Sequence, residues 1–226
     1  MNPYLNSLAI FFEQNQNAER VVAMKKYMKG QFDYFGIPSP KRKEIVSEFY
    51  KKKGKPSEDM LEEVVKSCWD QPQREFQYFA MELLQKFNKN AEICRVDLYE
   101  YLILSKSWWD TIDFIAANLV GPHFKKFPDS IVPYTEKWMD SGNVWLQRTA
   151  ILFQLKYKKN TDLELLDKYI NQLSGSKEFF INKAIGWILR EYSKTDARWV
   201  KNYVAENESI LANLSKREAL KWLDRQ

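Results

Sequence analysis

The sequence predicts an all-α protein made of repeated pairs of helices. Of its 226 residues, only seven are glycine and eight are proline, and apolar residues make up 45% of the chain. This composition is typical of a globular protein whose helices are joined by short turns. In addition, no segment shows the convincing alternation of apolar and polar residues, bounded by turns, that marks a β-strand.

Capping and turn residues mark the expected ends of the helices. Ser39-Pro40 begins one helix with a capping residue and a proline in its first turn, and Gly54-Lys55-Pro56 ends it. Ser57 caps the next helix, which ends near residues 70–72, and a further helix runs to about Lys89. In the rest of the chain we expect helix boundaries at Gly121-Pro122, Pro128, Ser141-Gly142 and Ser174-Gly175.

An alanine recurs along the chain at steps of 36, 34, 34 and 35 residues. A small residue at a fixed place lets neighbouring helices approach closely, and a period near 35 is that of a two-helix repeat. We therefore expect HEAT-like repeats, stacked over residues 1–226 into one curved solenoid with a concave groove. The alternative is a non-repetitive helical bundle in which the alanines recur by chance. These alanines are Ala80, Ala116, Ala150, Ala184 and Ala219.

Several classes of function are excluded. No apolar run reaches the roughly 18 residues that a membrane span needs, and the first residues do not resemble a signal peptide. Cys68 and Cys94 do not fit a metal-binding spacing, and the single histidine, His123, excludes histidine-based metal sites and catalytic triads. Nucleotide-binding motifs are absent from the sequence. We expect a cytoplasmic, monomeric protein that uses no metal and no cofactor.

Charge and aromatic content indicate a polyanionic partner. The formal net charge is +5, and eight tryptophans and twelve tyrosines exceed what a helical core requires. Runs of lysine and arginine on neighbouring repeats would supply contacts to the phosphates of a duplex. Taken singly, each run is also explained as a solvated helix face. The runs lie at residues 25–29, 41–43, 51–55 and 156–159.

The segment Ser105–Asp113 contains the most informative group of side chains. Trp109 and Asp113 are four residues apart and therefore share one helix face, whereas Trp108, Ile112 and Ile115 fall on a face that we expect to join the core. A carboxylate beside a partly exposed indole is a poor choice for packing alone. This pair is therefore a candidate for chemistry.

Later repeats add candidates of the same kind. Arg148 follows Trp145 by three residues, and Lys183 and Trp187 form another pair four residues apart, with Arg190 a turn beyond. These residues come from successive repeats and are predicted to converge on the groove. Each has a simpler interpretation: Trp187 as a packing residue, and Arg148 as a surface charge or the partner of Asp113 in a structural ion pair.

At these residues the chain resembles the AlkD-like DNA alkylation repair glycosylases, which are built from HEAT-like repeats. The resemblance covers essentially the whole chain, and its blocks occur in the order and at the spacing of that family. One position departs from the family, because Pro38 stands where relatives carry a polar glutamine near the DNA. The blocks are Lys26–Lys29 with Phe35–Ile37, Ser105–Asp113, Trp145–Arg148 with Gln154–Lys158, Ser176–Ile181 with Ala184–Trp187, and Ser215–Ala219.

The resemblance implies a DNA glycosylase that removes positively charged alkylated purines such as N3-methyladenine and N7-methylguanine. It implies that Asp113, Trp109 and Trp187 are catalytic and surround the deoxyribose of the lesion. It further implies excision without extrusion of the damaged base. The DNA-binding residues that we expect are Arg148, Tyr27, Lys156, Lys183 and Arg190.

Two other functions remain open at this point. A non-catalytic repeat protein could recognise damaged or branched duplexes by shape, and a HEAT array could serve as a protein-binding scaffold. Salt dependence separates the scaffold from the two DNA-binding functions, because phosphate contacts make affinity fall steeply as salt rises.

Overall fold

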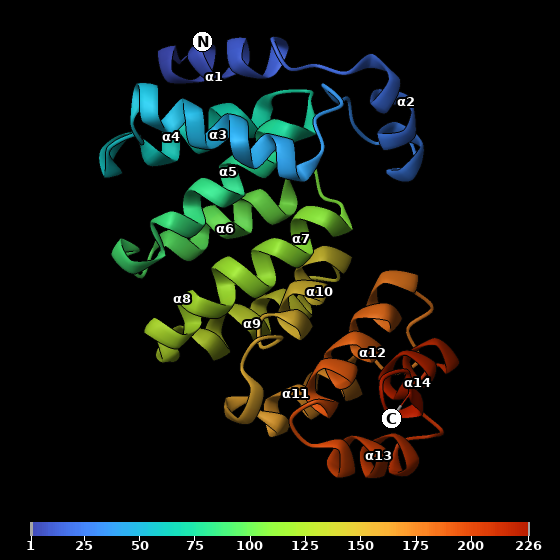
Figure 1. The fold of residues 1–226 in the computed structure, drawn as a ribbon. Coiled ribbons are helices and arrows are strands. Elements are labelled where there is room, and N and C mark those ends of the chain that lie inside the picture. The colour runs from blue at the N-terminus through green and yellow to red at the C-terminus, as the bar shows by residue number, and fades with distance from the viewer. Residues whose placement is uncertain (1, 226) are drawn as a thin grey trace. The chain divides into compact units, whose positions relative to one another are not determined.

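In the computed structural model, which describes residues 2–225, the protein is helical throughout (Figure 1). Within those residues the only β-type pairing is an isolated bridge between Asp33 and Gln73. The prediction of an all-α repeat protein is therefore confirmed. The chain divides into two compact units, one ending at Asn90 and the other beginning at Ala91.

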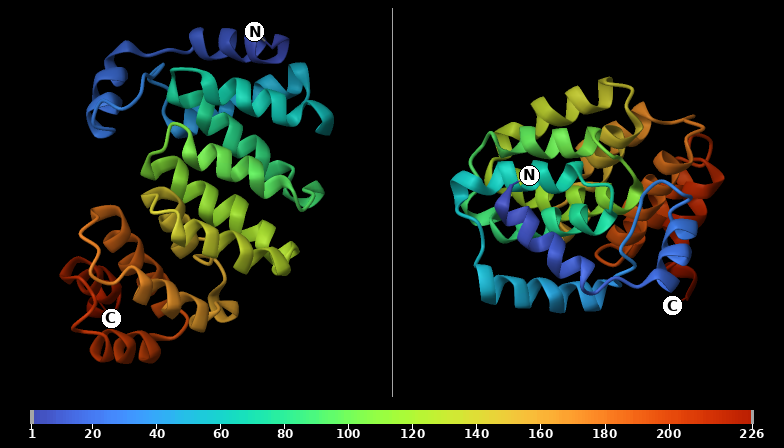
Figure 2. Two further views of the ribbon diagram at one scale, coloured as in Figure 1. Left: turned by 180° about the vertical axis from the view of Figure 1, so that it is seen from behind. Right: turned by 90° about the horizontal axis from the view of Figure 1, so that it is seen from above.

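The N-terminal unit stacks helices α1, α3, α4 and α5, while α2 lies at the side of this stack (Figure 2). Buried side chains come from every one of the four stacked helices, whereas α2 contributes none. This unit comprises α1 (Pro3–Glu13), α2 (Ala18–Tyr27), α3 (Ser39–Lys53), α4 (Glu58–Asp70), α5 (Arg74–Lys86) and the 3-10 turn Asn88–Asn90.

The C-terminal unit continues the alternation of paired helices (Figure 1). Its longest helix is α12, which packs against α10, α13 and α14. The unit comprises α6 (Arg95–Leu104), α7 (Trp109–Ile115), α8 (Gly121–Lys126), α9 (Ile131–Asp140), α10 (Val144–Leu152), α11 (Leu163–Gln172), α12 (Phe179–Ser193), α13 (Ala197–Glu206) and α14 (Asn213–Leu220).

Most of the predicted helix ends agree with the structure. Helix α3 begins at Ser39 and is followed by Gly54, whose φ of 72° an L side chain would adopt only with strain. Ser57 precedes α4 directly. The helix expected to reach about Lys89 ends earlier, at Lys86, and a 3-10 turn follows it.

The boundary predicted at Gly121-Pro122 is wrong. Helix α7 continues through a π-helical turn, Ala116–Val120, directly into α8. Pro122 has no N–H to donate to the carbonyl four residues earlier, and the wider turn before it lets the helix pass this residue. A Cβ on Gly121 would lie 2.4 Å from the carbonyl oxygen of Phe153, so this position requires glycine for close packing rather than as a helix end.

The five recurring alanines lie where the repeat model places them, in helical backbone at contacts between helices. None is more than 1% exposed to solvent. Gly186 in α12 serves the same purpose, because a Cβ there would lie 2.5 Å from the Cβ of Glu218 in α14. Small residues therefore set the spacing between successive helices, as the period of about 35 residues indicated.

A buried carboxylate holds the loop between α2 and α3. Glu75 is 0% exposed, and its carboxylate accepts hydrogen bonds of 3.0–3.1 Å from the backbone N–H groups of Phe35, Gly36 and Ile37. Burial raises the pKa of Glu75, and these three hydrogen bonds oppose the change. In the sequence Glu75 has the ordinary place of an acidic residue in the first turn of a helix, so nothing local reveals its burial.

His123 is buried, as a packing residue would be. Its side chain is 3% exposed, and its ring centroid lies 4.9 Å from that of Phe127 and 5.7 Å from that of Tyr99. Burial lowers the pKa of His123, and the positive charge of Lys126 lowers it further. The folded protein therefore favours the neutral ring.

We expect this burial to make the protein less stable in mild acid. Because the folded-state pKa of His123 lies below the unfolded value of about 6.5, its contribution is complete above that pH and is lost as the pH falls. Urea denaturation between pH 7.5 and 5.5 would measure the loss. In His123→Phe, which keeps a ring but cannot titrate, stability should change less over this range. An equal change in both proteins would contradict the assignment.

Candidate functional site

Helix α7 places Trp109 and Asp113 one turn apart. Trp108 precedes the helix in extended conformation, with φ −158° and ψ 158°, so that α7 begins at Trp109. Ile112 and Ile115 are 0% exposed, as predicted for the core face. The Asp113 side chain keeps 16% of its surface exposed, so the carboxylate is half-buried and has limited access to solvent.

Asp113 forms a two-pronged ion pair with Arg148 of α10. Arg148 Nε donates to Asp113 Oδ1 at 2.8 Å, and its second terminal nitrogen donates to Oδ2 at 3.0 Å. The remaining terminal nitrogen of Arg148 donates to the backbone carbonyl of Phe180 in α12. With only 3% of its side chain exposed, the guanidinium links three helices. Two parallel hydrogen bonds of this kind also fix the plane of the carboxylate.

The environment of Asp113 has opposing effects on its ionisation. Burial raises the pKa of Asp113, the hydrogen bonds and charge of Arg148 lower it, and the nearby charge of Asp110 raises it further. The net shift is upward from the usual value of 3.8. A carboxylate in such a setting is poorly hydrated, so it interacts strongly with any positive charge that develops next to it.

An aromatic cluster, which we define as Trp108, Trp145 and Phe180, packs beside the ion pair. Trp145 and Phe180 have ring centroids 4.8 Å apart, and Trp108 lies 5.8 Å from Trp145 and 5.4 Å from Phe180. The guanidinium carbon of Arg148 is 5.9 Å from the ring centroid of Phe180. The sequence analysis assigned no role to Trp145 or Phe180. The available signal was their spacing: Trp145 lies three residues before Arg148, and Phe180 lies three residues before Lys183.

Trp187 lies on α12 and is half-buried. Phe180, Lys183 and Trp187 are spaced three and four residues apart and therefore form one stripe along the helix. Phe180 begins this stripe, and its backbone carbonyl accepts a hydrogen bond from Arg148. Trp109 is also half-buried. The catalytic roles of Trp109 and Trp187 stay predictions.

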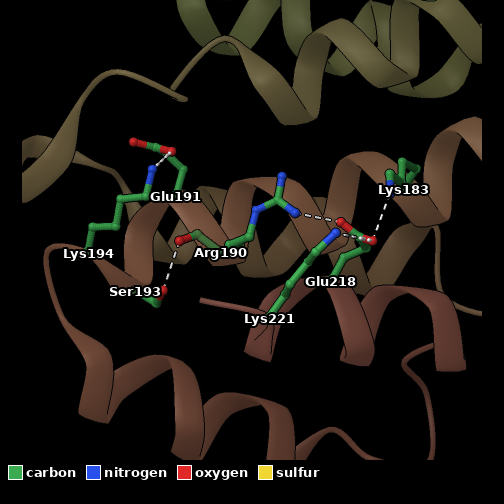
Figure 3. Close-up of polar contacts among 7 residues, drawn as sticks. All are labelled: Lys183, Arg190, Glu191, Ser193, Lys194, Glu218 and Lys221. Carbon is green, nitrogen blue, oxygen red and sulfur yellow. Dashed lines mark hydrogen bonds and ion pairs between the residues drawn. The ribbon is translucent and has the colours of Figure 1, made fainter. Parts of the chain in front are cut away.

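Lys183 and Arg190 meet at a carboxylate that the sequence analysis did not single out. Glu218 of α14 accepts from Lys183 at 2.8 Å and from Arg190 at 2.6 Å, and Lys221 approaches it at 3.9 Å (Figure 3). In the sequence Glu218 stood out only as part of the block Ser215–Ala219. Its partners Lys183 and Arg190 lie 35 and 28 residues away along the chain, and contacts over such distances leave no local pattern.

The other two candidate DNA-binding residues lie on different elements. Lys156 is exposed, and its Nζ donates to the side-chain oxygen of Asn118 at 2.7 Å. Tyr27 ends α2 in the N-terminal unit and is 69% exposed. Arg148 differs from these lysine and tyrosine side chains, because it is buried and uses three of its five N–H donors in the contacts described above.

Two features are absent from the residues that the structure describes. Within positions 2–225, no group of three or more histidine, cysteine, aspartate or glutamate side chains is arranged to hold a metal ion. In the same range, no helix is long and apolar enough to cross a bilayer.

Comparison with known proteins identifies the family. The family model for DNA alkylation repair enzymes matches residues 11–223. A solved structure of a predicted DNA alkylation repair enzyme from Enterococcus faecalis is similar, with a TM-score of 0.84 and 30% sequence identity over 93% of this chain and 98% of that one. A search of curated proteins gives no match. The family match over nearly the whole chain and the agreement in fold lead to one conclusion: this chain belongs to the DNA alkylation repair enzyme family.

Proposed function

We propose that the protein is a DNA N-glycosylase that removes cationic alkylated purines, including N3-methyladenine and N7-methylguanine. The family supports a role in DNA alkylation repair. The observation that favours glycosylase chemistry is the Asp113 carboxylate, half-buried and oriented by two hydrogen bonds from Arg148 at 2.8 and 3.0 Å. A site of this kind offers a fixed negative charge and needs no metal or cofactor.

The chemistry of the substrate suits such a site. When the C1′–N bond of a cationic purine breaks, its electron pair stays with the base, which leaves neutral and needs no general acid. Positive charge then develops on the deoxyribose as an oxocarbenium ion. A water molecule adds to C1′ and loses a proton, which leaves an abasic site. Asp113 stabilises the sugar cation electrostatically and orients the attacking water through its carboxylate.

Trp109 and Trp187 are proposed to flank the same sugar. An indole face stabilises a nearby cation by about 0.5–2 kcal/mol, depending on how far water is excluded. Two indoles therefore account for a minor part of the rate enhancement. The larger part is assigned to Asp113. From the resemblance to the AlkD-like glycosylases, we further propose that the base is not extruded from the duplex.

Binding of the duplex is assigned to basic and aromatic side chains from both units. We propose that the protein acts as a cytoplasmic, nucleoid-associated monomer whose repeats together form one DNA-binding domain. Phosphate contacts by Lys156, Lys183, Arg190 and Arg148, with Tyr27 from the N-terminal unit, then position the lesion. Because Arg148 is buried, its contribution is proposed to combine a phosphate contact with orientation of Asp113.

The test is base release from a duplex that carries N7-methylguanine. We expect the wild-type protein to release the base, and Trp109→Ala and Trp187→Ala each to slow release by about 2- to 30-fold, as the loss of one cation–π contact predicts. Chromatography of the freed base under single-turnover conditions measures this rate directly. Trp199→Ala, at a half-buried tryptophan of α13, is the matched control.

Two outcomes would redirect the proposal. If the wild-type protein binds DNA in a salt-sensitive manner but releases no base, the protein is a non-catalytic binder of damaged or branched DNA. If both indole variants release the base as fast as Trp199→Ala, the sugar lies elsewhere.

A further inference from the structure

Three cationic side chains converge on a single buried carboxylate in the C-terminal unit. Lys183 and Arg190 of α12 contact the two oxygens of Glu218 separately, at 2.8 and 2.6 Å, and Lys221 of α14 lies 3.9 Å from Oε1 (Figure 3). Lys183 and Arg190 are seven residues apart, so they lie on the same helix face about two turns from each other. The shared carboxylate brings their charged ends to one place.

The exposure of these groups differs in a way that bears on function. Glu218 keeps only 6% of its side chain exposed, whereas Lys183, Arg190 and Lys221 keep 36%, 24% and 47%. Burial would raise the pKa of Glu218, but the hydrogen bond and charge of Lys183 and the charges of Arg190 and Lys221 outweigh it and lower the pKa. Glu218 is thus ionised at neutral pH, and three cations around one anion present an excess of two positive charges to solvent.

The packing between α12 and α14 fixes Glu218 in this position. Gly186, which lies between Lys183 and Arg190, brings the two helices so close that a Cβ there would be 2.5 Å from the Cβ of Glu218. Ser215 Oγ also donates to the backbone carbonyl of Asn182 at 2.8 Å, one turn away. The carboxylate is therefore part of the rigid frame, and the cations are the movable part of the cluster.

We propose that Lys183, Arg190 and Lys221 form one binding site for a backbone phosphate of DNA, and that Glu218 is the positioning residue that gathers them. This inference rests on the DNA-binding part of the proposed function and adds Lys221 and Glu218 to it. Long cationic side chains lose conformational entropy when they are ordered on a ligand. Glu218 orders them before DNA arrives, so less entropy is lost on binding.

A purely structural role for Glu218 makes a different prediction. If the cluster only joins α14 to α12, removal of Glu218 lowers stability and takes away a negative charge, and the remaining excess of positive charge should attract DNA more strongly. If Glu218 positions the cations, its removal weakens DNA binding although the net charge becomes more positive. The sign of the change in affinity therefore distinguishes the two roles.

The first experiment tests Lys221. Fluorescence anisotropy would measure binding of an undamaged duplex from 50 to 300 mM salt for the wild type, Lys221→Ala and Lys194→Ala. Lys194 is the matched control, because its side chain is 46% exposed, close to the 47% of Lys221, and is paired with Glu191 instead of Glu218 (Figure 3). We expect Lys221→Ala to reduce the slope of log K against log salt by about 0.9, the value for one phosphate contact, and Lys194→Ala to leave it unchanged.

The second experiment tests Glu218 with the nearly isosteric Glu218→Gln. We expect its affinity for the same duplex to fall by about tenfold, which corresponds to ordering one long side chain on binding. In the double variant Glu218→Gln/Lys221→Ala, the loss should be smaller than the product of the two single losses, because the cations act as one site. Thermal unfolding of each variant would confirm that it is folded at the temperature of the assay.

Two results would overturn the inference: tighter binding by Glu218→Gln, or equal salt slopes for Lys221→Ala and Lys194→Ala. Both measurements use undamaged DNA and involve no base release. A protein that shows the predicted binding pattern but does not excise N7-methylguanine would therefore refute the glycosylase proposal and leave this site intact.

Discussion

Asp113→Asn is expected to slow release of N7-methylguanine by about 100- to 1000-fold, the usual effect of removing a preorganised electrostatic group from a catalytic site. Asparagine keeps the shape of the side chain and one acceptor for Arg148 Nε, but it carries no charge to stabilise the sugar cation. The affinity for a lesion-containing duplex should stay close to that of the wild type. Single-turnover base release and anisotropy on the same duplex measure the two effects separately.

The pH dependence of release provides an independent control for this prediction. Asp113 must be ionised to act, and its folded-state pKa is raised above 3.8. Release by the wild type, corrected for spontaneous depurination, should therefore fall with decreasing pH at a midpoint above 3.8. Asp113→Asn should show no such decline. Equal losses of binding and of release in Asp113→Asn, or an acid decline that persists in it, would assign the chemistry to another group.

Arg148→Met is expected to destabilise the fold by about 3–5 kcal/mol, because it leaves the half-buried carboxylate of Asp113 without its partner. The same change removes the hydrogen bond to the carbonyl of Phe180, and with it one link between α10 and α12. Base release should fall as well, since the carboxylate loses both its orientation and the positive charge that lowers its pKa. Urea denaturation at pH 7.5 measures the effect on stability.

The double variant Asp113→Asn/Arg148→Met is the control for Arg148→Met. Without a charge at either position, the buried site no longer contains an unpaired ion, so the double variant should be more stable than Arg148→Met alone. Additive losses of stability would mean that the two side chains do not act as a pair. A loss below about 1 kcal/mol in Arg148→Met would mean that the pair behaves like an ordinary surface ion pair.

The sequence predicted the helical elements well because they depend on local signals. Gly54 follows α3 with a positive φ that glycine adopts readily, and Ser57 is the N-cap of α4, although its side chain forms no capping hydrogen bond. Ser39 is the first residue of α3, after the N-cap Pro38. The helix end predicted at Gly121-Pro122 is wrong for a physical reason. A π-helical turn accommodates the missing N–H of Pro122, and close packing on Phe153 explains the glycine. Local rules do not contain either of these tertiary effects.

The fold class, the period of the repeats and the residue types available for chemistry can all be predicted from the sequence. Trp109 and Asp113 share a helix face because four residues are close to one turn of about 3.6 residues, and the buried alanines follow from the repeat. The partners of these charged side chains are known from the tertiary structure alone. Arg148 forms hydrogen bonds with Asp113 and Phe180, and Glu218 forms ion pairs with three cationic side chains. Apart from the local pair of Lys221 and Glu218, these contacts join residues 28 to 35 positions apart, so they depend on how helices pack and leave no signal in any one segment.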